Sequence, residues 1–344
     1  MQMTSWLPGR CGAILCAGAL AMSASTTCAQ TVIKLAHVNP ADWRVSQLAA
    51  ASEVFKNLVE AESSGRIQVQ LYPAGQLGGE VELVAQAQSG ALQIAFVSAV
   101  FGNYCKEASV LDIPFLFSSA EIAWKTLDGP FGRKLAEHCL KKTGLRTIAF
   151  GEVGFRNFTN SVREIKTPAD IRGLKIRVQQ IPIYVEMVKG LGGIPTPVAW
   201  PETPGALKAG MVDGQENPVA IILSNKFYDT QKYLTLDQHV YGTIFMLIND
   251  GFYQKLSAED REIVRRSAIL AQSAGRGIQQ VNSSAGVAEL AQRGMKVYKP
   301  NDAELAQFRA AAQPPVLAWL KTAIEPGWIE QVQKAVAAAH ADAP

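Results

Sequence analysis

The sequence predicts an α/β fold of two domains connected by a hinge made of strands. Its 344 residues are more than one domain usually needs. Short runs with strand character alternate with longer runs of helical spacing, which is the order of βαβ units. The chain leaves the first group of these units near Gly154 and returns near Tyr241. Strands therefore cross between the two predicted domains.

Composition allows a sizeable core and argues against disorder, with 48% hydrophobic and 18% charged residues. The net charge of +3 is too small to indicate a nucleic-acid or membrane-surface partner. We therefore expect no nucleic-acid partner. As a separate expectation, the protein is predicted to be a monomer.

The first 29 residues have the features of a Sec-type signal peptide. Met1–Arg10 contains one Arg and no acid, Cys11–Met22 is apolar, and Ser23–Ala29 is small and polar. The apolar run is too short to span a bilayer. We expect cleavage near Gln30 and a periplasmic mature protein. A buried N-terminal helix and a lipid anchor on Cys28 are the alternatives.

Cleavage leaves two cysteines, Cys105 and Cys139. An oxidising compartment permits a disulfide between them, but free thiols are an equal alternative.

The spacing of apolar residues predicts the helices and strands of the first domain. One apolar stripe runs through Leu48, Phe55 and Val59, as in an amphipathic helix, and clean alternation marks the strand at 67–72. In order, we expect strand Val32–His37, helix Trp43–Glu62, strand Ile67–Tyr72, helix Glu80–Ser89, buried strand Leu92–Val97, helix Ile122–Lys142 and strand Arg146–Gly151.

A polar loop at Gly154–Asn160 is predicted to open the second domain. Within it, Gly173–Val178 alternates apolar and basic residues, so it reads as a short strand entered from a capped turn at Thr167. Helix Ile181–Leu191 and a second short strand before Asn217 follow. The later elements are strand Tyr241–Asn249, a long helix capped by Ser257 and running to about Gln292, strand Gly294–Tyr298, and a mostly helical C-terminal third.

These crossings give domain boundaries. Domain I is expected at 31–153, about 243–281 and 310–344, and domain II at 154–242 and about 282–309. The cleft between such domains is the natural ligand site. A signal peptide followed by a hinged two-domain body suggests a periplasmic binding protein.

Four motifs in order carry a resemblance to a known family. They are Leu71–Gly78, Ile113–Phe117, Gly173–Val178 and Val212–Pro218. This set resembles the solute receptors of tripartite ATP-independent periplasmic (TRAP) transporters, of the dicarboxylate-binding (DctP) type, over roughly residues 31 to 335. The resemblance implies a type II-like periplasmic-binding-protein fold with a strand hinge and a long interdomain helix. It also implies a small organic-acid ligand and small and large membrane subunits as partners.

The resemblance assigns roles by position. Arg177 is similar to the arginine that clamps the ligand carboxylate, for which its planar fork is suited. Asn217 resembles the partner on the same carboxylate, and Arg156 a second cationic contact. Trp200 stands where the family has an aromatic ring, although the surrounding residues differ from many relatives. Ser98 and Asn39 are candidate polar contacts from the first domain.

Each assignment has an ordinary structural alternative. Arg177 could form a surface salt bridge, Asn217 an Asx turn, and Arg156 a positioning contact. Trp200 could belong to the core, and Ser98 and Asn39 could cap loops. Glu216 is expected to brace an arginine or the backbone rather than face an anion.

No catalytic motif or metal-ligand spacing is present, so we expect a binding protein without catalytic residues, metal or cofactor. The rivals are a sensor-only receptor and a secreted enzyme acting on an organic acid. The expected mechanism is capture by domain closure, in which an open form shows Arg177 and Arg156 to solvent and steers the anion inward.

Overall fold

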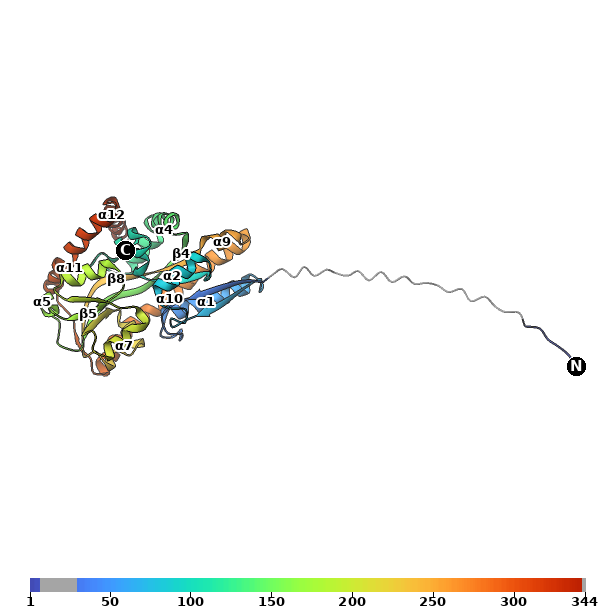
Figure 1. Ribbon diagram of the computed structural model, residues 1–344, viewed down its shortest axis with the longest axis horizontal. Helices are drawn as coiled ribbons and strands as arrows, with labels where there is room; N and C mark the ends of the chain where they lie inside the picture. Colours follow the sequence, from blue (N-terminus) through green and yellow to red (C-terminus); the bar gives the residue numbers. More distant parts are fainter. Residues whose placement is uncertain (7–29, 342–344) are drawn as a thin grey trace.

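The computed structural model describes residues 1–6 and 30–341, and one mixed sheet organises its folded part (Figure 1). The predicted signal peptide falls largely on residues 7–29, outside this range. The strands are β1 (Thr31–Ala36), β2 (Ile67–Tyr72), β3 (Ile94–Val97), β4 (Leu145–Asn160), β5 (Lys175–Val178), β6 (Ile194–Pro197), β7 (Gly214–Asn217), β8 (Tyr233–Asn249) and β9 (Lys296–Tyr298). Their order is β2-β1-β3-β8-β4-β7-β5-β6, with β9 beside β8.

Helices cover both faces of the sheet. The α-helices are α1 (Gln47–Glu62), α2 (Glu80–Ser89), α3 (Ala120–Asp128), α4 (Pro130–Thr143), α5 (Pro168–Ile171), α6 (Pro182–Gly190), α7 (Thr203–Lys208), α8 (Val219–Ser224), α9 (Asp250–Lys255), α10 (Ala258–Gln292), α11 (Asp302–Ala323) and α12 (Gly327–Ala341). Short 3-10 turns occur at η1 (Ala99–Asn103), η2 (Lys106–Asp112), η3 (Trp200–Glu202) and η4 (Phe227–Asp229). Among the described residues, no helix has both the length and the apolar character needed to cross a membrane.

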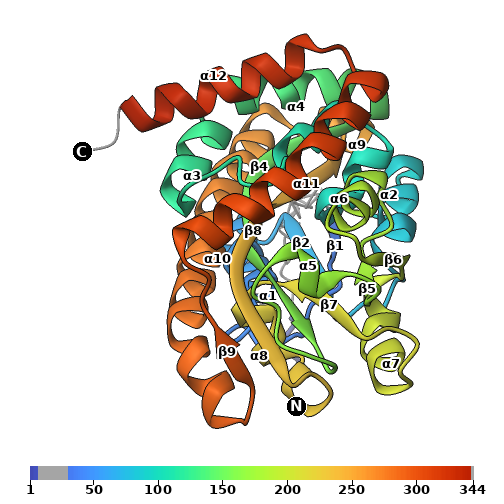
Figure 2. The same ribbon diagram turned by 90° about the vertical axis from the view of Figure 1, so that its left-hand side faces the viewer.

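Two long strands connect the two halves of the sheet. β4 and β8 run antiparallel from the pair Leu145–Asn249 to the pair Asn160–Tyr233. At one end β8 pairs with β3, and at the other end β4 pairs with β7. The strand hinge expected from the sequence is therefore present, and α10 packs against α1 at one end and α8 and β9 at the other (Figure 2).

The side chains of β8 show how the sheet separates two cores. Phe245 and Leu247 pack with α3, α4, α11 and α12 on one face, whereas Ile244, Met246 and Ile248 pack with α1 and α10 on the other. Successive side chains of a strand point to opposite faces of the sheet. A strand that is apolar along its whole length is therefore expected where helices cover both faces.

The polar loop expected at Gly154–Asn160 is wrong, because β4 continues through it. Gly154 has a φ of 104°, in the region that favours glycine, and irregular register lies on both sides of it. The strand resumes beyond this point, with Phe158 and Thr159 fully buried. β8 likewise begins at Tyr233 rather than at Tyr241.

Two helices begin or end at residues other than those that the sequence predicted. The first helix begins at Gln47 rather than Trp43, because Ser46 is its N-cap and accepts a hydrogen bond from Ala49 N. The helix expected over 122–142 is two helices, separated at Gly129, with Pro130 at the first position of α4.

Other local predictions are confirmed. Thr167 and Asp170 form the expected capping box before β5, and Gly173 has a φ of 75°. Ser257 caps α10 through Asp260 N. Of the alternatives for the cysteines, the structure has the disulfide Cys105–Cys139. The domain boundaries remain a prediction.

Candidate functional site

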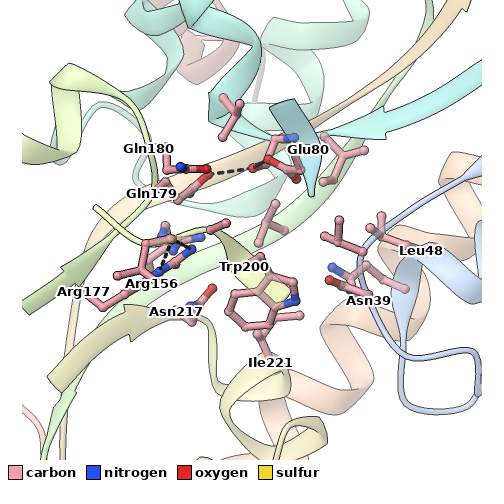
Figure 3. A pocket seen from close by; sticks show the side chains of 18 residues that line it. Asn39, Leu48, Glu80, Arg156, Arg177, Gln179, Gln180, Trp200, Asn217 and Ile221 are labelled. Atoms are coloured by element: carbon pink, nitrogen blue, oxygen red, sulfur yellow. Dashed lines mark hydrogen bonds between the residues drawn. The ribbon is translucent and has the colours of Figure 1, made fainter. Parts of the chain in front are cut away.

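A cavity lies where the two halves of the sheet meet, and its wall includes all six residues that the sequence singled out. It is lined by Val38, Asn39, Gln47, Leu48, Glu80, Ser98, Val100, Val153, Arg156, Arg177, Gln179, Gln180, Val198, Ala199, Trp200, Asn217, Ile221 and Ile244. Figure 3 shows Arg156, Arg177 and Asn217 on one side, Asn39 and Leu48 on the other, and Glu80 above. The wall is therefore polar at both ends and apolar between them.

Arg177 lines the cavity and has one nitrogen without a hydrogen-bond partner among the described residues. The end of β5 carries this residue, and its Nε and Nη2 donate to Val198 O at 3.0 and 2.7 Å. Nη1 is buried and has no hydrogen-bond partner in the described part of the chain. Burial lowers the pKa of Arg177 to about 10, so the guanidinium remains charged at neutral pH. A buried cation with a free donor is a site for an anion.

Arg156 is held by a carboxylate rather than left free. Its Nη2 donates to Glu216 O at 2.7 Å and to Glu216 Oε1 at 2.8 Å, and its Nε donates to Glu216 Oε2. Glu216 is fully buried, and burial alone would oppose its charge, but Arg156 keeps the pKa of Glu216 below its usual value. Glu216 thus braces an arginine, as expected from the sequence.

A second buried pair lies behind Glu216. His239 Nε2 is 3.3 Å from Glu216 Oε2, and His239 Nδ1 is 2.9 Å from Asp237 Oδ2. Burial opposes the charged imidazole, but Asp237 and Glu216 together raise the pKa of His239 to about 9. The order Asp237, His239, Glu216, Arg156 therefore alternates in sign up to the cavity.

Arg177 and Arg156 are both buried in this structure, and their exposure in an open form stays a prediction. Each is 2% exposed. Arg177 lies over the Trp200 ring at 5.5 Å, and Arg156 lies over the Tyr184 ring at 5.3 Å. Aromatic faces and the Glu216 carboxylate cover both guanidinium groups.

Trp200 contacts both the site and the core. Besides Arg177, its ring lies 5.8 Å from the Phe227 ring. The indole is only partly buried and packs at the border of all three hydrophobic clusters of the described chain. One indole thus joins the cavity wall to the packing of both halves.

The three remaining predicted residues lie at separate points of the wall. Asn217, on β7, donates from Nδ2 to Gln215 Oε1 at 2.5 Å. Ser98 follows β3 and bonds to Glu80 and Gln179. Asn39 lies in the loop after β1, with its Nδ2 3.4 Å from Gln47 Oε1.

Sequence reasoning missed four polar wall residues, which are Gln47, Glu80, Gln179 and Gln180. Glu80 has the ordinary place of an acid in the first turn of a helix, which gave no sign of a cavity. Gln179 comes two residues after Arg177, and the period of two in a strand could have indicated that the two side chains lie on the same side. Gln47 is buried with an unpaired Nε2, and nothing in the local sequence distinguishes it.

One group of possible metal ligands occurs in the described residues. Cys105, Glu107 and His138 have ligand atoms within 4.8 Å of one another, but the Cys105 sulfur is bonded to Cys139. Glu107 also accepts from Lys142 Nζ at 2.6 Å. These partners already occupy two of the three groups, so the cluster does not fit a metal centre.

Comparison with known proteins gives one consistent group. Residues 35–322 match the family described as bacterial extracellular solute-binding protein, family 7. A solute-binding protein from Verminephrobacter eiseniae is 35% identical and covers 90% of this chain and 91% of its own. The 2,3-diketo-L-gulonate-binding periplasmic protein YiaO of Escherichia coli is 33% identical, over 74% of this chain and 77% of its own.

Solved structures agree with these relatives. The sugar acid binding protein DctPAm of Advenella mimigardefordensis, in complex with galactonate, has a TM-score of 0.86 and 33% identity, covering 90% of this chain and 99% of its own. A TRAP periplasmic solute-binding protein from a Bordetella species, with density assigned to pantoate, has a TM-score of 0.83 and 34% identity, covering 89% and 99%.

Proposed function

The chain belongs to the bacterial extracellular solute-binding proteins of family 7, the receptors of TRAP transporters, and from this we propose that its cavity holds a small organic acid by its carboxylate. The observation that carries the proposal is the Arg177 guanidinium, which is buried and charged, belongs to a residue of the cavity wall and has an unpaired Nη1. Relatives named for sugar acids and for C4-dicarboxylates support a carboxylate in either case.

We assign different roles in binding to the six wall residues that the sequence singled out. Arg177 makes the ion pair, because its Nη1 has no partner while its Nε and Nη2 donate to Val198 O. Arg156 supplies positive potential while Glu216 fixes its position. Trp200 provides a flat apolar wall. Asn217, Ser98 and Asn39 contribute hydrogen bonds at the two ends of the cavity.

Closure of the two halves on the ligand is the proposed mechanism. The wall combines groups from the first half, such as Asn39 and Ser98, with Arg177 and Asn217 from the second. A ligand that touches both sets makes more contacts when the halves are together, so binding shifts the population toward the closed form. Excluding water strengthens the ion pair with Arg177.

A thermal-shift screen of organic acids tests this function. A ligand at a hundred times its dissociation constant should stabilise the folded protein by about 2.7 kcal/mol, which raises the melting temperature by at least a few degrees. Matching amides and alcohols should give no shift, since they leave the buried Arg177 charge unpaired. Hits should persist in the presence of a chelator. Hits confined to neutral sugars, or conversion of the bound acid, would contradict the proposal.

The family is one of receptors and not of enzymes, and its members act outside the cytoplasm. We propose further that the loaded form delivers its acid to the small and large integral membrane subunits of a TRAP transporter. Genes for both subunits beside the gene for this chain would support transport. A signalling partner there, without those subunits, would favour the sensor-only alternative.

Periplasmic export is expected to remove residues 1–29. The basis is the short apolar run at Cys11–Met22 and the small residues before Gln30. N-terminal sequencing of protein from the periplasmic fraction should therefore begin near Gln30. A chain that still begins with Met1, or one held in the membrane by a lipid on Cys28, would contradict this prediction.

A further inference from the structure

A second cavity lies beside the start of β4 and shares no wall residue with the Arg177 cavity. Its wall comes from the end of α3 and from α4, β4, α9 and α10, and Figure 1 shows α4, α9 and β4 close together. Its volume is about 420 Å³. Small-molecule sites typically measure about 300 to 1,000 Å³, so this cavity has the size of a ligand site.

Small residues leave this space open. Ala136 on α4, Ala149 on β4 and Ser273 on α10 all belong to the wall, where larger side chains would fill the cavity. Gly151 acts in the same region, because a Cβ built on it would lie 1.9 Å from Gln272 Oε1. The glycine therefore allows the Gln272 side chain to lie against β4.

The cavity follows one edge of β4. Five consecutive residues, Arg146–Phe150, line it, and successive side chains of a strand alternate between its faces. A cavity that contacts all five therefore lies along the edge of the strand. β8 pairs with the other edge here, and β7 joins β4 only at Asn157–Asn160. No strand of the described chain covers this edge, and Arg276 Nη2 donates to Phe150 O at 2.7 Å.

Two wall residues on α10 have a buried donor without a partner. Gln272 is 3% exposed and Arg276 is 8% exposed. Gln272 Nε2 and Arg276 Nε make no hydrogen bond within the described residues, although Arg276 Nη1 and Nη2 donate to Asp128 at 2.6 and 2.9 Å. A buried donor without an acceptor opposes folding, so a bound acceptor here would be stabilising.

The charges around the cavity sum to a positive value. The wall holds one carboxylate, Asp128, and four guanidinium groups, those of Arg133, Arg146, Arg265 and Arg276. Two carboxylates beyond the wall pair with these arginines, Asp250 and Glu262. Four positive and three negative charges leave one positive charge. Arg261 and Glu152, which interact with the wall residues Tyr253 and Arg276, add at most one charge of each sign. The acceptor that suits this site is therefore an anion.

The rest of the wall is mainly apolar. It includes Leu127, Ile148, Phe150, Ile269 and the ring of Tyr253, over which the Arg146 guanidinium lies at 5.2 Å. Ile269 is 48% exposed, so the cavity meets solvent at this side chain. A ligand that fills the cavity therefore needs an apolar body as well as a charged group.

We propose that this cavity is a second ligand site, which takes a small organic anion with an apolar body. Gln272 and Arg276 donate to the anionic group, and Leu127, Phe150 and Ile269 contact the body. The inference goes beyond the proposed function and does not depend on it, because Arg177 has no part in this cavity.

Calorimetric titration with naphthalene-2-sulfonate tests the site. Naphthalene-2-sulfonamide has the same rings without the charge, and sulfate has the charge without the rings. The sulfonate should bind at least about tenfold more tightly than either compound, because it alone meets both the donors and the apolar wall. Its affinity for Arg177→Met should be within about twofold of that for the wild type.

Two neighbouring residues on α10 provide a matched pair of variants. Ile269 and Leu270 are both 48% exposed, but only Ile269 lines the cavity. Ile269→Glu should weaken binding of the sulfonate at least about tenfold, because it puts a negative charge beside the ligand anion, whereas Leu270→Glu should match the wild type. Gln272→Met removes a donor at similar length and should weaken binding about tenfold. Unfolding curves check that all three variants fold.

Each contrary result has a distinct meaning. If the sulfonate does not bind, the cavity holds only water and the proposal is overturned. If the sulfonamide binds equally well, the cavity is not an anion site. If Arg177→Met abolishes binding and Ile269→Glu does not change it, the sulfonate occupies the first cavity, so the second site is overturned while the proposed function stands. If Ile269→Glu and Leu270→Glu weaken binding equally, the ligand does not lie in this cavity.

Discussion

Replacing Arg177 with methionine should weaken binding of the cognate acid at least a hundredfold. Hydrogen bonds to charged groups contribute about 1.5 to 3 kcal/mol each, and a carboxylate on the Nη1 and Nη2 edge of Arg177 receives two. Losing both corresponds to a hundredfold or more in the dissociation constant. Calorimetry with an acid found by the thermal-shift screen measures the change.

Arg177→Lys separates geometry from charge. The ammonium group keeps the positive charge but cannot hold Val198 O and a carboxylate through a planar fork. We expect a loss of about 2 kcal/mol, or roughly thirtyfold in affinity. If either variant bound the acid within twofold of the wild type, Arg177 would not be the residue that holds the carboxylate.

The same substitution has little expected effect on the ligand-free protein. Arg177→Met removes a buried cation whose Nη1 is unpaired, which favours folding, but it also removes both donors to Val198 O. These effects oppose each other. A melting temperature near that of the wild type, combined with lost binding, would distinguish a ligand contact from a structural arginine.

The parts of the fold that the sequence predicted well depend on local patterns. Alternation in Gly173–Val178, the capping box at Thr167 and the glycine at 173 determine the β5 strand within a few residues. The order of strands and helices then indicates an α/β sheet with a strand hinge. The family resemblance, rather than any period, indicated Arg177 as the carboxylate contact.

The parts that sequence reasoning missed depend on contacts between distant segments. Gly154 looks like a loop residue, and only its pairing with β8 shows that the strand passes through it. Glu80 accepts a hydrogen bond from Ser98, 18 residues away in the sequence. The Asn217 amide is oriented by a series of hydrogen bonds that runs from Gln231 through Thr159 and Gln215. No period or motif in the sequence encodes a relay of this kind.

Arg156 shows the same limit in a different way. The sequence predicted Arg156 as a site residue. It predicted only that Glu216 would brace an arginine or the backbone, without indicating that Arg156 is that arginine. The structure makes this a fully buried ion pair, so the arginine and the glutamate must be considered together. Removing one member of such a pair leaves the other as an uncompensated buried charge.

Glu216→Gln should destabilise the ligand-free protein by about 3 to 5 kcal/mol, because Arg156 then lies buried without a counter-charge. Urea unfolding measures the change. Glu164→Gln is the matched control, since its partner Lys166 is on the surface, and it should cost less than about 1 kcal/mol.

The double variant Arg156→Met with Glu216→Gln isolates the role of Arg156 in binding. Since it removes both charges, it should recover most of the stability that Glu216→Gln loses. If the recovered protein binds the acid about tenfold or more weakly than the wild type, Arg156 supplies potential or a contact to the ligand. If it binds with wild-type affinity, the pair is purely structural. A single Glu216→Gln variant as stable as the wild type would show that the pair is not needed to hold Arg156 in the fold.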